Sequence, residues 1–232
     1  TEDFLAGHEI FGTDYAYLSS ESTSSLNQVQ RFDDDVLHPL NLGPKNLVVE
    51  VGSNDGYLLQ FVQDRRIPCI GIEPTASTAA MARQRGIRTV EAFFGRSTAS
   101  QFVHEHGQAD FVIANNVLAH VPDLADFVGG LAVLLKPDGI LSVEFPRLTS
   151  LVDGRQFDTV YHEHFSYFSL HSARSVLERS GLEIYDVEEL PTHGGSLRIY
   201  AHHRRTGKNS VAPSVSSILD FESSRGDRTI HY

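Results

Sequence analysis

The sequence VEVGSNDGY at residues 49–57 decides the fold that we expect for this chain. An apolar run beginning at Leu47 leads into it, which is typical of a buried strand. Gly52 and Gly56 then allow a tight turn, because glycine adopts backbone torsions that a Cβ forbids. Apolar residues at helical spacing follow at 58–64. The stretch therefore predicts a strand, a turn and a helix, with room for a ligand against the turn.

Acidic residues end the first two predicted strands. Glu50 lies at the end of the first strand, and the apolar run that starts at Cys69 ends at Glu73. An acid after the second strand of such a unit is placed to accept the hydroxyls of a ribose. Asn54 and Asp55, within the turn, are residue types that cap a following helix. This arrangement favours a ligand that contains a nucleoside.

The dinucleotide fingerprint GxGxxG would also place a glycine turn and an acid at these points, but its spacing is not met. The turn has only two glycines, and Asp55 puts a negative charge where a pyrophosphate would meet the helix N-terminus. A cationic cofactor without phosphates fits better. S-adenosyl-L-methionine carries a sulfonium, an amino group and an adenosine, which suit carboxylates at Glu50 or Asp55 and at Glu73. A glycine turn that only packs a helix is the alternative.

Strand-like and helical segments alternate along the rest of the chain. Strands are expected at residues 47–51, 70–73, 89–90, 110–114 and 140–145. Helices are expected at residues 58–64, 77–85, 98–106, 124–135 and 172–180, and a turn at 136–139. Two late strands, 182–188 and 196–202, are joined by a loop and predict an antiparallel edge. The alternation predicts an α/β, Rossmann-like fold with a mostly parallel sheet and helices on both faces.

Composition and charge restrict the class of partner. The chain has 232 residues, enough for one sizeable core, and a formal net charge of −11. It contains no Lys/Arg-rich block, which argues against binding of nucleic acid or of an anionic membrane. No apolar run reaches about eighteen residues, and the first residues lack the features of a secretory signal. We therefore expect a soluble, cytoplasmic protein that binds a small molecule; its oligomeric state has no signal in the sequence.

Three regions differ in composition. Residues 1–40 are rich in Ser, Asp and aromatics, and we expect a lid or substrate-facing segment there, with simple packing on the domain surface as the alternative. Residues 41–204 are the expected cofactor-binding domain. Residues 205–232 turn to Ser, Lys, Gly and Pro, with a weak amphipathic pattern at 215–221. This last region is expected to be a linker or the start of a further domain.

Six motifs occur in one order along the chain. They are VEVGSNDGYLL (49–59), GIEP (71–74), NNVLAHVPD (115–123), LLKPDG (134–139), YHEHFSYFS (161–169) and THGGSLR (192–198). Together they resemble the class I S-adenosylmethionine-dependent C-methyltransferases that act on nucleotide-linked deoxyketosugars. The resemblance extends over residues 15–202. It implies a Rossmann-like class I methyltransferase fold, with S-adenosyl-L-methionine as the cofactor.

Two features of that family are missing from this sequence. Members usually carry a cysteine-rich zinc module before this region, and a further C-terminal domain that helps to hold the nucleotide sugar. Cys69 is the only cysteine, so neither a disulfide framework nor zinc is expected. The resemblance therefore implies either a fragment or a shorter relative with another acceptor.

Methylation of carbon requires a base and a group that stabilises an enolate oxygen. His164 is the best candidate base, because imidazole titrates near neutral pH, and by resemblance it matches the family's base. Glu163 is expected to orient His164 or to raise its basicity. Tyr161 and His120 are expected to donate hydrogen bonds to the ketone or enolate oxygen. A metal site made by these side chains and histidines with a structural role only are the alternatives, and His162 is expected to be structural.

The remaining candidates are contacts to the cofactor and to the acceptor. The expected cofactor contacts are Glu50, Gly52, Ser53, Asn54, Asp55, Glu73, Pro74, Phe94, Gly95 and Asn115. Tyr15 and Tyr17 match aromatics that face the acceptor in the family. His193 precedes a glycine turn whose amides either approach a ligand or form a simple hairpin bend.

The sequence therefore predicts a methyltransferase that removes a proton from a carbon next to a ketone and methylates that carbon. The expected acceptor is a nucleotide-linked deoxyketosugar. An O- or N-methyltransferase of another small molecule is the alternative within the class. A catalytically incomplete module that only binds S-adenosyl-L-methionine is the alternative outside it, and a nicotinamide oxidoreductase ranks third because the third glycine is missing.

Overall fold

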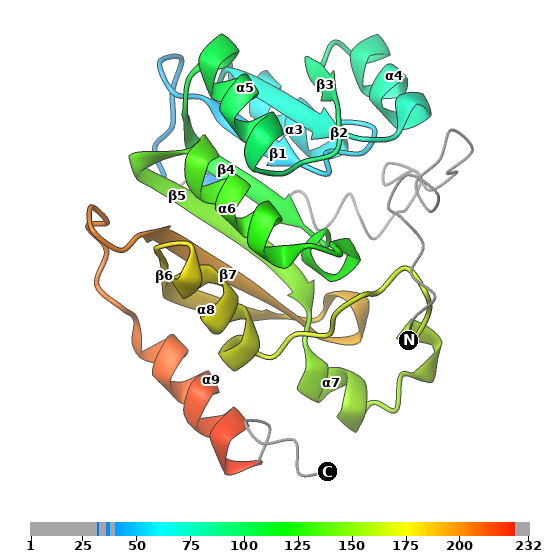
Figure 1. The fold of residues 1–232 in the computed structure, drawn as a ribbon, viewed down its shortest axis with the longest axis vertical. Coiled ribbons are helices and arrows are strands. Elements are labelled where there is room, and N and C mark those ends of the chain that lie inside the picture. The colour runs from blue at the N-terminus through cyan, green and yellow to red at the C-terminus, as the bar shows by residue number, and fades with distance from the viewer. Residues whose placement is uncertain (1–31, 33–35, 38–39, 226–232) are drawn as a thin grey trace.

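A computed structural model describes residue 32, residues 36–37 and residues 40–225 of the chain. Its centre is a seven-stranded sheet with the strand order β3-β2-β1-β4-β5-β7-β6 (Figure 1). The strands are β1 (Val48–Val51), β2 (Cys69–Glu73), β3 (Thr89–Glu91), β4 (Ala109–Asn115), β5 (Leu135–Pro146), β6 (Leu182–Leu190) and β7 (Ser196–His203). Strands β1 to β5 pair in parallel, whereas β7 pairs antiparallel with both β5 and β6. The predicted fold, a mostly parallel sheet with an antiparallel edge, is confirmed.

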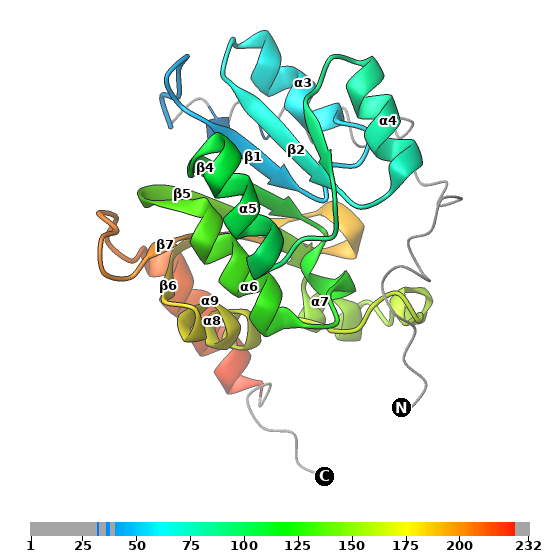
Figure 2. The same ribbon diagram turned by 45° about the horizontal axis from the view of Figure 1, so that its top comes forward.

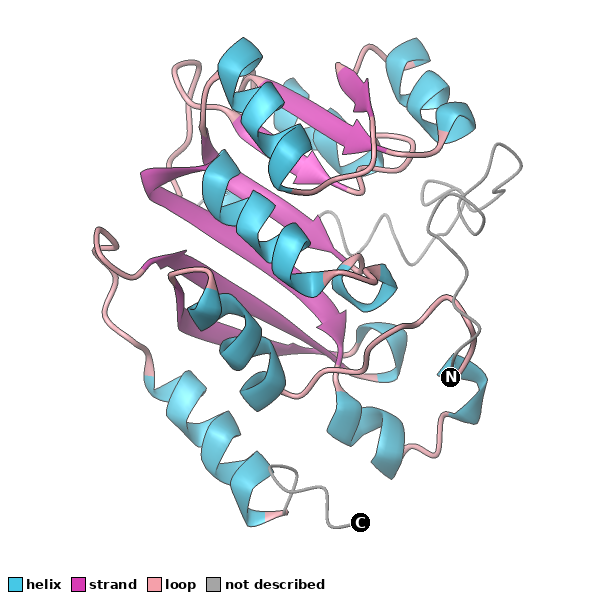
Figure 3. Cartoon of the chain, in the orientation of Figure 1, coloured by secondary structure: helices cyan, strands magenta, loops and turns pink. Residues whose placement is uncertain are grey.

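Helices cover both faces of the sheet, as the cyan ribbons around the magenta strands show (Figure 3). They are α3 (Tyr57–Asp64), α4 (Ala76–Gln84), α5 (Arg96–His106), α6 (Leu124–Leu134), α7 (Leu148–Asp153), α8 (Leu170–Arg179) and α9 (Pro213–Ser224). Three 3-10 turns complete the elements: η3 (Leu118–His120), η4 (Phe157–Thr159) and η5 (Thr192–Gly194). Helices α5, α6 and α8 bury side chains on one face, and α3 and α4 bury theirs on the other. The chain therefore changes faces between β1 and β4.

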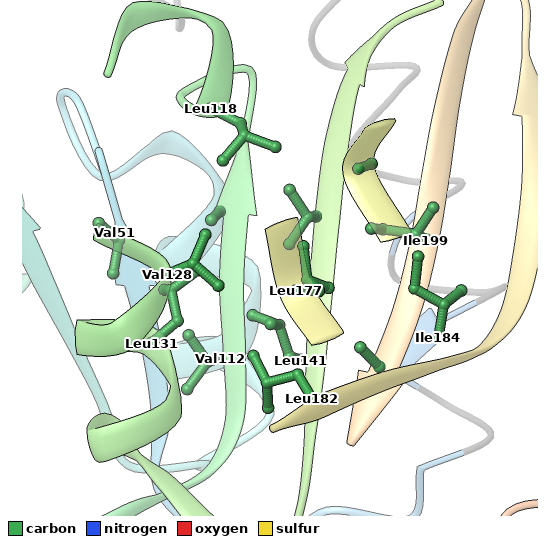
Figure 4. Close-up of a cluster of buried hydrophobic side chains, with 14 of the residues drawn as sticks. Val51, Val112, Leu118, Val128, Leu131, Leu141, Leu177, Leu182, Ile184 and Ile199 are labelled. Atoms are coloured by element: carbon green, nitrogen blue, oxygen red, sulfur yellow. The ribbon is translucent and has the colours of Figure 1, made fainter. Parts of the chain in front are cut away.

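The larger part of the core lies between the sheet and the helices α5, α6 and α8. Val128 and Leu131 of α6 and Leu177 of α8 point at Val112 and Leu141 of the central strands (Figure 4). All four residues of β1 are buried, as expected for a central parallel strand that is covered on both faces. The core thus fixes the strands whose carboxyl ends meet near the turn after β1.

The start of α3 differs from the expectation. The helix begins after Gly56, whose φ is 75°, and no side chain caps it. The Asn54 side chain instead accepts a hydrogen bond from the Asp55 amide at 2.9 Å. The Asp55 carboxylate is buried and forms an ion pair with Arg85 at 2.7 Å. The prediction that Asn54 and Asp55 cap the helix is therefore wrong, because local and ionic partners compete for their oxygens.

Two other segments also differ from the expected pattern. Residues 136–139 were expected as a turn and instead lie within β5. Ala109 pairs with Leu135 and Phe111 with Ile140, so the strand accommodates these residues as an irregularity in its ladder. Helix α7 was not expected, and at six residues it is too short to show a clear periodicity.

Residues at both ends of the described chain pack on this domain. Phe32 is buried and stacks on Phe111, with 6.3 Å between the ring centroids. Helix α9 buries Val215, Ile218 and Leu219 beside β6 and α8, where Figure 2 also places it. No helix in the described part of the chain is long and apolar enough to cross a membrane. The roles expected for residues 1–40 and 205–232 stay predictions.

Replacement of Gly71 by Ala is expected to lower the free energy of unfolding by about 1–3 kcal/mol, the usual cost of overpacking a filled core. A Cβ on Gly71 would lie 2.3 Å from Ser53 Oγ and 2.9 Å from Ser53 Cβ, so the turn after β1 must move. Gly43→Ala is the control, because a Cβ there has nothing within 4 Å. Urea unfolding of the three proteins measures the difference. Equal midpoints for Gly71→Ala and Gly43→Ala would show that the turn is not tightly packed.

Candidate active site

A cavity of about 540 Å³ lies where the chain changes faces, at the carboxyl ends of β1, β2 and β4. Ligands of open α/β sheets bind at such a point, and the volume is in the range of small-molecule sites. Glu50, Glu73 and Asn115 enter the cavity from the strand ends. Its lining residues are Glu50, Val51, Gly52, Asn54, Tyr57, Ile72, Glu73, Pro74, Thr75, Ala92, Phe93, Phe94, Asn115, Asn116, Val117, His120, Val121, Pro122, Asp123, Asp126, Phe127 and Tyr161.

The charged groups that line this cavity are all acidic. Carboxylates come from Glu50, Glu73, Asp123 and Asp126, and none of the lining residues is Lys or Arg. Glu50 is 2% exposed, and its Oε2 has no hydrogen-bond partner. Burial raises the pKa of Glu50 well above its ordinary value, and the neighbouring Glu73 and Asp55 raise it further. A ligand that brings positive charge would satisfy this carboxylate, whereas a pyrophosphate would be repelled.

Glu73 is held in a fixed orientation at the end of β2. Its Oε1 accepts hydrogen bonds from the Thr75 amide at 2.9 Å and from Thr78 Oγ1 at 3.2 Å. Its Oε2 accepts one from the Asn54 amide at 2.9 Å, which joins the turn after β1 to the end of β2. Oε1 thus already has two donors, whereas Oε2 has one and keeps capacity for a second. Oε2 can therefore receive a ribose hydroxyl without rearrangement.

The turn after β1 approaches the opposite wall of the cavity closely at Gly52. Its φ is 70°, and a Cβ there would lie 2.4 Å from Cγ2 of Val117. Only glycine fits this conformation and this space. Val117 belongs to the segment that follows β4, so the glycine lets backbone from β1 and β4 line one narrow cleft.

Seven of the ten residues predicted to contact the cofactor line the cavity: Glu50, Gly52, Asn54, Glu73, Pro74, Phe94 and Asn115. Three do not. Ser53 is fully buried behind the turn, against Gly71. Asp55 is buried and paired with Arg85. Gly95 precedes α5, where a Cβ would lie 2.0 Å from Asp126, so its role is to let α5 pack closely on α6.

The YHEH segment brings three rings together beside the cavity. The hydroxyl of Tyr161 lies 3.1 Å from Nε2 of His164, and the two ring centroids are 4.3 Å apart. The His120 ring packs edge-on against His164 at 4.8 Å. Tyr161 and His120 line the cavity itself, whereas His164, which contacts both, is not one of the lining residues. The segment forms turns and irregular backbone, not a strand. His162 and His164 therefore do not lie on one face of a strand.

Backbone carbonyls fix the tautomers of both histidines. Nδ1 of His164 lies 2.9 Å from the Thr159 carbonyl and must donate its proton there. Nε2 of His164 is therefore the basic nitrogen, and Tyr161 can donate its hydroxyl proton to it. In the same way Nδ1 of His120 donates to the Glu163 carbonyl at 3.0 Å. Each ring is thus held by a carbonyl of the loop that contains the YHEH motif.

Burial keeps both histidines neutral near pH 7. It lowers the pKa of His120 to about 4, with a further decrease from the neighbouring His164. Burial also lowers the pKa of His164; the Thr159 carbonyl and Glu163 act in the opposite direction, and His193 adds to the decrease. A neutral imidazole is the form that accepts a proton, so His164 is in the state a general base requires.

The other predicted site residues lie at the edge of the site or outside the described residues. Glu163 is half-buried, and its charge acts on His164. His193 is exposed, with φ 51° in η5, while His162 is also exposed. Tyr15 and Tyr17 fall outside the described residues. Within the described part of the chain, no three His, Cys, Asp or Glu side chains are grouped as a metal site would require.

Several lining residues were not identified from the sequence. Asn116 and Val117 follow the predicted Asn115 directly, and Asp123 and Asp126 belong to the start of α6. The NNVLAHVPD motif contains Asn116, Val117 and Asp123. The whole motif therefore indicated the lining of the cavity better than Asn115 alone. Phe93 is 46% exposed and lines the cavity together with the predicted Phe94.

A Rossmann-like sheet with an acidic, cation-free cleft at its crossover point defines the class I methyltransferases that use S-adenosyl-L-methionine. The model of the methyltransferase domain family matches residues 26–187 of the chain. The chain therefore belongs to this methyltransferase domain family.

Curated relatives include both C- and O-methyltransferases. C-methyltransferase NovU of Streptomyces niveus is 35% identical over 224 residues, which cover 97% of this chain and 52% of NovU. The ubiquinone biosynthesis O-methyltransferase of Rhodopseudomonas palustris strain BisB5 is 30% identical over 96 residues, which cover 41% of this chain and 38% of the relative. The chain therefore spans about half the length of NovU.

Solved structures share the fold at low sequence identity. The magnesium protoporphyrin IX methyltransferase ChlM of Synechocystis PCC 6803 with bound SAH has a TM-score of 0.59 at 18% identity. The match covers 84% of this chain and 91% of ChlM. A methyltransferase of Aquifex aeolicus has a TM-score of 0.54 at 13% identity, covering 80% of this chain and 98% of that one.

Glu50→Gln is expected to stabilise the protein without its cofactor, by an amount that increases with pH. Because the pKa of Glu50 is raised in the folded state, the native protein loses stability as the pH rises above the ordinary value of 4.5 and the buried carboxyl ionises. Glutamine has no such ionisation. Thermal unfolding from pH 5 to pH 8 measures the effect, with the exposed Glu105→Gln as control. A stability difference independent of pH would contradict the raised pKa.

Proposed function

We propose that this chain carries out C-methylation: it removes a proton from a carbon next to a ketone and methylates that carbon. One observation supports this more than any other, the contact of Tyr161 and His120 with His164 at the wall of an acidic cavity. A base and a neutral hydrogen-bond donor side by side are what formation of an enolate requires. Bound S-adenosyl-L-methionine supplies the methyl group.

Each residue of this cluster has a distinct part in the proposed mechanism. Nε2 of His164 accepts the proton from the carbon, since its Nδ1 already donates to Thr159. The imidazolium that results is stabilised by Glu163, whose charge raises the pKa of His164. Tyr161 is a neutral donor placed to stabilise the enolate oxygen. Tyr161 is 41% exposed, so exclusion of water by the bound ligands would strengthen this interaction. The predicted donor role of His120 does not fit the same state, because its one proton is on Nδ1, which donates to the Glu163 carbonyl. His120 would instead pack against His164 and hold its ring in place.

The cofactor is expected to contact the cavity through its carboxylates. Glu50 would bind its cationic part, which offsets the cost of burying a negative charge. Glu73 would accept a ribose hydroxyl, and Pro74 and Phe94 would cover the adenine. Asn115 and Gly52 would line the methionine end. Ser53, Asp55 and Gly95 would hold the turns that present these groups, because none of them reaches the cavity.

We propose a nucleotide-linked deoxyketosugar as the acceptor. Support comes from the motifs at 161–169 and 192–198 and from the 35% identity to a protein named as a C-methyltransferase. We further propose that Tyr15, Tyr17 and His193 contact this acceptor and that the protein works in the cytoplasm, without binding nucleic acid or a membrane. The net charge of −11 agrees with this last point.

O-methylation is the second candidate function, because relatives named O-methyltransferases match 41% of the chain. In that case His164 would remove a proton from oxygen instead of carbon. Exchange of the acceptor's C–H for deuterium, in D₂O and without cofactor, separates the two reactions. Only a base aimed at carbon catalyses this exchange.

Calorimetric titration with S-adenosylhomocysteine, with NAD in a parallel titration, is the first test of the proposed site. Micromolar binding of the former and none of NAD is expected, because the cavity has four carboxylates and no cation to hold a pyrophosphate. Glu50→Gln should weaken binding at least about tenfold, which corresponds to about 1.4 kcal/mol. Binding of NAD, or of neither ligand, would contradict the cofactor assignment.

His164→Asn is expected to slow deuterium exchange at the acceptor carbon by about 10²- to 10⁴-fold, the usual contribution of a general base. The affinity of the variant for S-adenosylhomocysteine should stay within about threefold of the wild type, because His164 is not one of the residues that line the cavity. His162→Asn, on the same loop but exposed, is the matched control. In the wild type, exchange should continue below pH 6.5, since burial lowers the pKa of His164. Equal exchange rates for both variants would exclude His164 as the base.

A further inference from the structure

The carboxylate of Glu222 on α9 is fully buried, and it binds the start of α8. Its Oε1 accepts a hydrogen bond from the Leu170 amide at 2.9 Å, and its Oε2 accepts one from the His171 amide at 3.1 Å. These amides are the first two of α8, where the helix dipole favours a negative charge. A side chain more than fifty residues away in the sequence thus supplies a cap that α8 does not provide itself.

The capping of α8 is complete only with Glu222. Ser169 and Ser172 form a capping box, in which Ser169 Oγ accepts from the Ser172 amide at 3.2 Å and Ser172 Oγ accepts from the Ser169 amide at 3.0 Å. The capping box does not bind the amides of Leu170 and His171, and Glu222 accepts hydrogen bonds from both. His171 adds a second link, since its Nε2 lies 3.1 Å from the Leu219 carbonyl of α9.

Arg147 connects the same carboxylate to the loop that carries the YHEH motif. Its Nε lies 3.8 Å from Oε1 of Glu222, and its NH1 lies 2.5 Å from Oε2 of Glu189. The Arg147 backbone forms a bridge with Phe168, and the next amide, of Leu148, donates to the Phe168 carbonyl at 2.8 Å. A buried cation, a buried anion and the end of the loop therefore meet at one point.

Between this point and His164 the loop has no helix or strand to define its path. Residues 160–169 lie between η4 and α8, in the pink segment that leads into α8 in Figure 3. The Phe165 amide donates to the Ala119 carbonyl at 2.8 Å, which ties the middle of the loop to η3. The position of His164 therefore depends on tertiary contacts at both sides of the loop.

We propose that Glu222 is a positioning residue for His164: by holding the start of α8 and Arg147, it fixes the end of the loop that places this histidine. The inference rests on the proposed function, because it takes His164 as the base. Glu222 touches neither the cavity nor His164, so it acts only through the backbone of the loop and α8. Helix α9 thereby becomes part of the support of the active site.

The test compares Glu222→Gln and Glu222→Asp with Leu219→Ala. Glutamine keeps the volume but loses the charge and one acceptor, aspartate keeps the charge, and Leu219→Ala loosens α9 elsewhere, since Leu219 is 8% exposed. The readout is the imidazole ¹⁵N–¹H spectrum, with the His164 signals assigned through His164→Asn. Wild-type His164 should show the Nδ1–H tautomer that its contact with Thr159 requires.

Glu222→Gln is expected to shift the His164 signals towards a mixture of tautomers and to leave S-adenosylhomocysteine affinity within about threefold. Glu222→Asp should restore part of the wild-type spectrum. Leu219→Ala should lower the unfolding temperature and leave the His164 signals unchanged. If Glu222→Gln loses stability while its His164 signals coincide with the wild type, Glu222 is only a structural cap and the proposal is wrong. Because the spectrum requires no acceptor, failure of the C-methylation proposal would appear separately, in the exchange assay.

Discussion

The change of faces between β1 and β4 is the constraint on which the site depends. Helix α3 leaves β1 on one side of the sheet and α6 leaves β4 on the other, so no crossover covers the carboxyl ends of these two neighbouring strands. Backbone amides and strand-end side chains face a cleft there. Gly52 keeps the cleft narrow, since any larger residue would collide with Val117. Burial of Glu50 and Glu73, near the ends of their strands, follows from this geometry.

Burial makes the cleft electrostatically unfavourable while it holds no ligand. Glu50 lies close to Glu73 and Asp55, and only Asp55 has a cation, Arg85, as a partner. A buried carboxyl without a partner favours its neutral form, so the protein without cofactor carries a cost that a cationic ligand removes. On this basis we expect the site to discriminate between cofactors by charge as well as by shape. Burial lowers the pKa of His164, whereas it raises that of Glu50. The His164 ring is thereby kept neutral, which is the form that can accept a proton.

The features that could be predicted from the sequence are those that depend on residues close to one another in the chain. The strand, glycine turn and helix of residues 48–64 and the acid at Glu73 follow from periodicity and residue type, and the structure has them. The prediction that Asn54 and Asp55 cap the helix was wrong, because Arg85, thirty residues away from Asp55, binds the Asp55 carboxylate. The YHEH segment was recognised as chemically important, but its path could not be predicted. It has no regular hydrogen-bonding pattern, and its path depends on single contacts such as that of the Phe165 amide with the distant Ala119 carbonyl.

Under the proposed mechanism, this loop would link catalysis to parts of the protein that have no chemical role. The rings of Tyr161 and His164 must keep a separation of 3.1 Å between hydroxyl and nitrogen, and a displacement of about 1 Å is enough to cost a large factor in rate. Helices resist such displacement because their hydrogen bonds are internal, whereas a loop depends on its ends. One end of this loop is held at Thr159 and the other at α8, which is capped from α9. If His164 is the base, as we propose, its precise placement therefore depends on a buried acid, Glu222, that does not line the cavity.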